Sequence, residues 1–320
     1  MLAQKRVDVN SREEGGWTPL LLAAEEGRDE VVRLLLAHKR IEANAKSDVG
    51  RTPLLGAAAD GHDTEVRLLL EKGVDVNTKN ESGRTALAQA AQNGHAEMVE
   101  VLLAQKGVDV NSRENGGWTV LLLAAETGKE EVIKLLLPCK GIDVDAENNL
   151  NRRPFLGATA NGHVSTVRLL LEKGGFDINA KGGYSRTLLA EAAPRGYTEI
   201  AQLLLAQEGV DINARDSDGA TVLFVGSRGR ARRGSAVTTR AKWGPGQREE
   251  RCRSNATIMA AANGHEAVVR LLSSKEGVDI NAADNSGRTL LSFTTENKRE
   301  AVVQLLRENT LYMDTAIEYV

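Results

Sequence analysis

The stretch GRTALAQAAQNGHAEMVEVLLAQKGVDVNSREN, residues 83–115, decides the fold because related versions of it recur along the chain. Its opening phrase, Gly-x-Thr-x-Leu, returns at a regular period, or at twice that period, at Gly16, Gly50, Gly83, Gly117, Gly219 and Gly287. Asn151 and Ser185 begin diverged copies in the two missing registers. Self-similarity at such a period indicates stacked repeats rather than one globular core. We therefore expect about nine copies of one structural unit.

Caps and turn residues within residues 83–116 predict two short helices followed by a loop. Thr85 stands at a helix N-cap position, where a Thr side chain stabilises the helix by about 1 kcal/mol. Gly94 is expected to end this first helix in the left-handed conformation. The second helix is expected to open at His95 and to end at Gly107, because Val99, Leu102 and Leu103 repeat at helical spacing. One such unit cannot bury its Leu face alone, so stability must come from contacts between neighbouring units.

The composition excludes several broad classes of protein. The 320 residues carry a formal net charge of −3 and only 3% aromatic residues, so the core must consist of aliphatic side chains. The weak negative charge gives no whole-chain argument for binding nucleic acid. Cys139 and Cys252 lie far apart, which indicates neither a disulfide framework nor a metal site. No apolar run reaches the roughly 18 residues of a membrane span, and no signal peptide is visible.

These units resemble the ankyrin repeat, which has about 33 residues and a Thr-Pro-Leu-His-x-Ala signature. The resemblance rests on Gly-Trp-Thr-Pro-Leu at 16–20, Gly-Arg-Thr-Pro-Leu at 50–54, the Ala-Ala and Gly-His pairs, and the Val-Asp-Val-Asn loops. The signature His is absent, because Leu21 and Leu55 stand in its place. If this His joins adjacent hairpins by hydrogen bonds in the family, these repeats lack those bonds. The resemblance implies an all-α ankyrin-repeat solenoid of about nine helix-turn-helix units with short β-hairpin loops.

The chain divides into four parts by its repeat pattern. Residues 1–15 read as the tail of a truncated preceding repeat, which favours a fragment of a longer chain. Leu2–Glu13 returns almost unchanged as Leu103–Glu114, so a block of three repeats has been duplicated. The remaining parts are 16–225, with repeats starting at 16, 50, 83, 117, 151, 185 and 219; the atypical basic segment 226–252, which disrupts a repeat; and 253–320, two further repeats with a C-terminal cap.

The basic segment admits three interpretations, which the sequence leaves open. Residues 226–253 hold nine Arg and Lys residues against two Glu residues. They can be a compensated frameshift in the coding DNA, a disordered insert, or a basic patch for nucleic acid. The frameshift is favoured because Gly219 and Gly287 lie two full periods apart, whereas an insert should add length. In each case we expect a loose interface between the repeat at 219 and residues 253–320.

Catalytic and metal-binding constellations are not evident. Four of the five His residues (His62, His95, His163 and His265) share one register at the start of a second helix, and His38 stands apart. Because these four lie on successive layers, we expect them to cap or pack rather than to bind one metal ion. The repeated Asp and Asn residues of the loops are expected to stabilise turns. We expect no cofactor and no enzyme activity.

The residue between Gly and Thr in the repeated phrase is the most informative position for function. By the resemblance, this row lies on the concave side of the array, where partners bind. Trp and Arg are the residues that dominate interface hot spots. An acidic and polar row from the ends of the first helices, including Glu25 and Asp60, is expected beside it. The candidate partner-binding residues are Trp17, Arg51, Arg84, Trp118, Arg152, Arg186 and Arg288.

The sequence therefore predicts a monomeric, intracellular scaffold that binds an unidentified protein partner on its concave face. Neither nucleic acid nor membrane is expected as a partner. Two alternatives remain. The chain can be the sensor or adaptor fragment of a larger signalling protein with an upstream effector domain, or it can bind RNA through residues 226–253.

Overall fold

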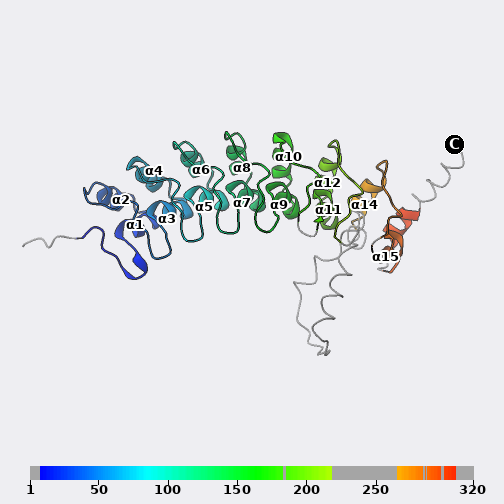
Figure 1. Cartoon of the computed structure of the whole chain (residues 1–320), viewed down its shortest axis with the longest axis horizontal. Helices are drawn as coiled ribbons and strands as arrows, with labels where there is room; N and C mark the ends of the chain where they lie inside the picture. The colour runs from blue at the N-terminus through cyan, green and yellow to red at the C-terminus, as the bar shows by residue number, and fades with distance from the viewer. Residues whose placement is uncertain are drawn as a thin grey trace, which may run out of the picture. The chain divides into compact units, whose positions relative to one another are not determined.

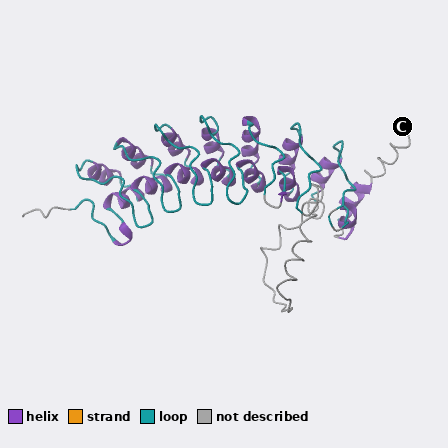
Figure 2. Ribbon diagram, viewed as in Figure 1, coloured by secondary structure: helices purple, strands orange, loops and turns teal. Residues whose placement is uncertain are grey.

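The computed structural model describes residues 8–182, 185–217, 265–283, 285, 287–296 and 299–307. The chain divides into two compact units. Unit 1 holds Met1–Ala158 and Leu169–Gly175, and unit 2 holds Thr159–Arg168 and Phe176–Val320. In the residues that the structure describes, helices alternate with loops and no strand is present (Figure 2). The predicted all-α class is thus confirmed.

Unit 1 is built from pairs of short helices, each with an inner helix that begins at a cap and an outer helix that follows after a tight turn (Figure 1). The inner helices are α1 (Pro19–Glu25), α3 (Pro53–Asp60), α5 (Ala86–Asn93) and α7 (Val120–Thr127). The outer helices are α2 (Asp29–Leu36), α4 (Asp63–Glu71), α6 (Ala96–Leu103) and α8 (Glu130–Leu136). Each inner helix contacts the next inner helix, and each outer helix contacts the next outer helix. A short 3-10 helix, η1 (Glu14–Gly16), precedes α1, and α9 (Pro154–Asn161) and α10 (Val164–Lys173) span the division between the units.

Unit 2 contains α11 (Leu188–Ala192), which continues as the 3-10 helix η3 (Ala193–Arg195), and then α12 (Thr198–Leu205), α14 (Glu266–Ser273) and α15 (Leu290–Glu296). Residues 300–307 are also helical. Helix α12 contacts both α11 and α14. The predicted repeat start at 219, the basic segment 226–252 and the repeat start at 253 lie outside the described residues. So do residues 1–7 and the last residues of the expected C-terminal cap, 308–320.

The helix ends match the sequence prediction because capping is a local interaction. Thr85 Oγ1 accepts a hydrogen bond of 3.2 Å from the Ala88 amide, and Thr18 does the same for Leu21 at 3.3 Å. Pro19 occupies the first turn of α1, where a missing N–H leaves no bond unmade. Gly94 ends α5 with a φ of 86°, a left-handed conformation that favours glycine. The predictions for Thr85 and Gly94 are confirmed.

The core of unit 1 lies between the layers and consists of aliphatic side chains. The Leu residue two positions after each cap is buried, as Leu20, Leu54 and Leu87 show. The Ala90-Ala91 pair is fully buried between neighbouring inner helices. Such small side chains let adjacent helices approach closely, so thin layers can form without aromatic residues.

The loops have the turns of hairpins but not their strands. The Ser47 amide donates to the Arg51 carbonyl, and the Gly50 amide donates to the Ser47 carbonyl, both at 2.9 Å. Among the described residues, strand-like pairing is limited to two isolated bridges, Arg113–Thr119 and Ala283–Thr289. The expected β-hairpins are therefore reduced to tight turns, because each loop makes too few cross-loop bonds to form a ladder.

Neighbouring loops are tied together without the signature His of the family. The Asn residue of each Val-Asp-Val-Asn loop forms what we call an asparagine clamp. Asn77 Nδ2 donates to the Gly107 carbonyl, and Asn77 Oδ1 accepts from the Asp109 amide, both at 2.8 Å. Two residues further on, Lys79 Nζ donates to the Arg113 carbonyl at 3.0 Å. These side chains supply the ties that the missing His left in question.

One loop and the helix start that follows it depart from this scheme at three positions together. Asp145 replaces the clamp Asn, Glu147 replaces the Lys or Arg, and Arg153 replaces the Thr cap. The Arg153 guanidinium pairs with Asp145 through Nη1 and with Glu147 through Nη2, the latter at 2.6 Å. A single guanidinium thus pairs with both acidic substitutions. The sequence pattern marked this copy only as diverged, because the partners of Arg153 depend on how the loop folds.

Candidate protein-interaction surface

Two tryptophans of the predicted row lie half-buried on unit 1, next to glycines of their own loops. A Cβ atom on Gly15 would lie 3.1 Å from Trp17 Cδ1, and one on Gly116 would lie 3.4 Å from Trp118 Cδ1. Each indole therefore lies against a backbone that carries no side chain there. This support holds a large apolar ring at the surface in a defined position.

Each of these tryptophans is followed, one loop further on, by an exposed aliphatic side chain at a turn. Val49 is 56% exposed and Leu150 is 64% exposed. The loop of Val49 is bonded to the loop of Trp17, because the Asp48 amide donates to the Gly15 carbonyl at 2.9 Å. The Asn149 amide donates to the Gly116 carbonyl at the same distance. We call Trp17 with Val49 the first apolar anchor, and Trp118 with Leu150 the second.

The aliphatic members of these anchors were missed by sequence reasoning. Other copies have Ser82 or Gly116 at this position, which is the apex of a turn. An apolar residue there was the signal that could have identified Val49 and Leu150. Turn apices favour small and polar residues, so Val or Leu there needs a reason. The block duplication places both anchors at equivalent positions, three repeats apart.

The arginines of the predicted row are engaged in ion pairs within the chain. Arg51 Nη2 lies 3.3 Å from Glu25 Oε1 of the preceding repeat, and Arg152 Nη1 lies 2.5 Å from Glu126 Oε1. Arg84 Nε lies 2.5 Å from Glu114 Oε2. Glu25 and Glu126, which belong to the expected acidic row, therefore pair with arginines of the predicted binding row. The positive charges of these three arginines are therefore balanced locally by carboxylates of the chain itself.

The last two members of the row lie in unit 2. Arg186 is 8% exposed, and its guanidinium lies 3.7 Å from Asp216 and 3.9 Å from Glu191. A direct contact with a partner would require this side chain to move. Arg288 is half-buried. Arg186 is therefore the one buried residue of the predicted set, and the other six members are half-buried.

Glu25 lies in the same repeat as Trp17, and its pKa is raised from the ordinary value of a Glu side chain. Burial raises the pKa of Glu25, Arg51 acts against this shift, and the nearby carboxylates of Asp60 and Glu26 raise it further. Burial therefore outweighs the ion pair with Arg51.

The His register serves packing between layers, as the sequence predicted. The ring of His62 lies against Gly27, and its Nε2 lies 2.9 Å from the Glu25 carbonyl oxygen. His95 Nε2 lies 3.3 Å from the Ala59 carbonyl oxygen in the preceding layer. The rings thus cover the carboxyl end of the preceding inner helix, and they do not cap their own helices. In the described part of the chain, no group of three or more His, Cys, Asp or Glu residues could hold a metal ion.

Cys139 has the properties of a packed thiol. Its Sγ donates to the Leu135 carbonyl at 3.4 Å, one turn earlier. Burial raises the pKa of Cys139, and Lys173 only partly offsets that effect. Since the thiolate is the reactive form, this environment disfavours nucleophilic chemistry.

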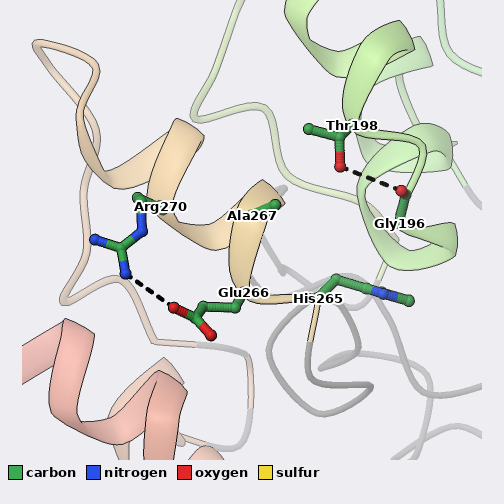
Figure 3. Close-up of a pocket in the computed structure, with 6 residues that line it drawn as sticks. All are labelled: Gly196, Thr198, His265, Glu266, Ala267 and Arg270. Atoms are coloured by element: carbon green, nitrogen blue, oxygen red, sulfur yellow. Dashed lines mark hydrogen bonds and ion pairs between the residues drawn. The ribbon is translucent and has the colours of Figure 1, made fainter.

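A shallow pocket of about 510 Å³ lies in unit 2 where α12 and α14 begin. Gly196, Thr198, His265 and Arg270 are among its lining residues (Figure 3). Arg270 pairs with Glu266 on the same helix at 2.8 Å. A Cβ atom on Gly196 would lie 2.5 Å from His265 Nδ1. The His265 ring therefore lies against Gly196, just as the His62 ring lies against Gly27. The pocket is a gap between stacked layers and holds no catalytic arrangement.

Comparisons with known proteins agree with this description. The family model for ankyrin repeats (three copies) matches residues 1–80, 54–148, 145–216 and 236–316. A similar solved structure is the ankyrin repeat domain of Bcl-3, described as a unique member of the IkappaB protein family. It is 29% identical with a TM-score of 0.58, and the match covers 66% of this chain and 94% of that chain. No curated protein matches.

The matched family is an interaction module, and neither match points to an enzyme family. In the described portion of the chain, no helix is long and apolar enough to cross a membrane.

Proposed function

Since the chain belongs to the ankyrin-repeat family, we propose that it is a non-enzymatic scaffold whose protein partner docks on the face formed by the loops and inner helices. The observation that carries this proposal is the pair of equivalent apolar anchors on unit 1. Contiguous apolar patches rimmed by polar residues mark interaction sites, and we infer that each anchor forms such a patch. We place the scaffold in the cytoplasm or the nucleus.

The spacing of the anchors defines the kind of partner. Packed helices lie about 8–10 Å apart, so three repeats separate the anchors by about 25–30 Å. The favoured partner presents two apolar side chains, or two small hydrophobic pockets, at that separation. Trp17 and Trp118 supply area at little cost in conformational entropy, which is typical of hot spots. The paired arginines beside them exclude water around the contact.

Trp118→Ala is expected to leave the fold intact and to weaken partner binding about 10- to 100-fold, the range of a hot-spot truncation. A partner recovered by affinity capture and then purified would be titrated by calorimetry against the full chain and the variant. Circular dichroism would verify that helicity is unchanged.

Trp17→Ala serves as the parallel variant, and Glu100→Ala on the exposed face of α6 serves as the control. If both Trp variants bind as tightly as the Glu100→Ala variant, the partner does not use the anchors and the proposed surface is wrong. Loss in only one Trp variant would indicate a partner that uses one anchor.

A second candidate function is that of an adaptor module within a larger signalling protein. Val31 is 46% exposed and Leu34 is 75% exposed on α2, at positions that later outer helices bury or partly bury. An apolar face of this kind favours contact with a further repeat or domain. In-frame coding sequence upstream of Met1 would support this function.

Salt-dependent RNA affinity that is lost on deleting residues 226–253 would instead support RNA binding.

A further inference from the structure

The sequence separation between an asparagine clamp and the residues that it bonds shows which two loops are stacked on each other. In unit 1, Asn111 Nδ2 donates to the Gly141 carbonyl, 30 residues later, and Asn111 Oδ1 accepts from the Asp143 amide, 32 residues later. Arg113 Nη1 donates to the Glu147 carbonyl, 34 residues later. Asn77 and Lys79 make the same bonds at the same spacings. These three spacings are the signature of directly adjacent repeats.

In unit 2, the same three bonds join residues that lie one full period further apart. Asn213 Nδ2 donates to the Gly277 carbonyl, 64 residues later, at 2.6 Å. Asn213 Oδ1 accepts from the Asp279 amide, 66 residues later. Arg215 Nη1 donates to the Ala283 carbonyl, 68 residues later, at 2.9 Å. Each spacing exceeds its counterpart in unit 1 by the same amount, the length of one repeat.

The helices show the same juxtaposition. His265 lies against Gly196 as His95 lies against Gly61 in unit 1. Helix α14 contacts α12, as α6 contacts α4 in unit 1. The outer helix that begins at Glu266 therefore occupies the layer next to the repeat that begins at 185.

From this register we infer that residues 225–258 are an insertion within one repeat, and that the array is continuous on either side of it. When Phe224 is joined to Met259, the sequence becomes Thr221-Val-Leu-Phe-Met-Ala-Ala-Ala-Asn-Gly-His265. The corresponding stretch in unit 1 is Thr85-Ala-Leu-Ala-Gln-Ala-Ala-Gln-Asn-Gly-His95. The cap Thr, the core Leu, the Ala-Ala pair and the Asn-Gly-His end all coincide.

The insertion is one period long, so residues 219–286 read as two repeats when only spacing is counted. The array then has eight repeats rather than the nine that the sequence pattern predicted. In this register residues 265–283 complete the repeat that starts at 219, so the boundary between that repeat and residues 253–320, where we expected a loose interface, does not arise. The inserted residues carry nine basic and two acidic side chains, so the array without them has a net charge of −10.

The test compares two deletions of equal length in the full chain. Deleting residues 225–258 should change the melting temperature by no more than about 2 °C and should retain the hydrogen-exchange protection of residues 266–273. Deleting residues 219–252 removes a segment of the same length, but it discards Thr221 and Leu223 and places Thr257 where Leu87 stands in unit 1. The melting temperature should then fall by at least about 5 °C, with loss of that protection.

The inference is overturned if deleting 225–258 abolishes protection of residues 266–273. It is also overturned if the two deletions give the same melting temperature and the same protection. Joining Phe224 to Met259 would then restore a repeat no better than the other junction does. Neither outcome bears on the anchors of unit 1, so this test is independent of the proposed function.

Discussion

Glu65→Met should raise the free energy of unfolding by about 2 kcal/mol near neutral pH, because it removes a buried carboxylate from an apolar position. Glu65 is 2% exposed, and its Oε1 atom makes no hydrogen bond. The equivalent positions of other outer helices hold Met98, Val132 and Ile200, all buried. Met is therefore accommodated by this layer geometry, and it forms helices well.

The gain should depend on pH in a defined direction. Burial raises the pKa of Glu65, a hydrogen bond with Asp29 and the charge of Asp29 raise it further, and a backbone hydrogen bond and His62 lower it. A carboxyl group whose pKa is raised by folding stabilises the protein fully below its unfolded pKa. That contribution is lost as the pH rises through the folded pKa. The difference between Glu65→Met and the parent should therefore grow from about pH 4.5 to about pH 7.5.

Urea unfolding at these two pH values measures both effects. Thr166→Val is the matched control, since Thr166 occupies the same position of a later outer helix, is 1% exposed and does not ionise. Its effect should not depend on pH. An unchanged or lower free energy of unfolding for Glu65→Met would show that the carboxyl group is better satisfied than this structure indicates.

Asn111→Ala should lower the free energy of unfolding by about 1–3 kcal/mol, because it removes both bonds of one asparagine clamp. Asn111 Nδ2 lies 2.7 Å from the Gly141 carbonyl oxygen, and Oδ1 lies 2.9 Å from the Asp143 amide. Ala can form neither bond. Since a repeat array owes its stability to contacts between neighbours, one weakened interface affects the cooperativity of the whole array.

The control for this variant is Asn115→Ala in the same loop. Asn115 Nδ2 makes one inter-repeat bond, of 2.9 Å to the Glu81 carbonyl. We expect about half the loss of stability. Denaturant curves for both variants decide the matter, and an equal or smaller loss for Asn111→Ala would mean that the clamp does not stabilise the interface.

Much of the repeat unit could be predicted because its signals are local. The Thr cap, the glycine at the end of each inner helix and the apolar stripe act within a few residues of one another. The row of candidate residues, Trp17 and Trp118 among them, was predicted from the same register, and its role in partner binding stays a prediction. Val49 and Leu150 were not, because their exposure depends on neighbouring loops. The ion pairs of the arginines were missed for the same reason.

The amino-acid sequence by itself determined the unit, its helix ends and its family resemblance, since each follows from hydrogen bonds and apolar spacing inside one period. Only the tertiary structure decided which copies are neighbours, that Glu65 is enclosed by an adjoining layer and that Arg153 joins two acidic residues. These features depend on contacts between segments distant along the chain. Asn213 is the clearest case, because its partners in the chain are Gly277 and Asp279, and period counting cannot distinguish an insertion of one period from an additional repeat.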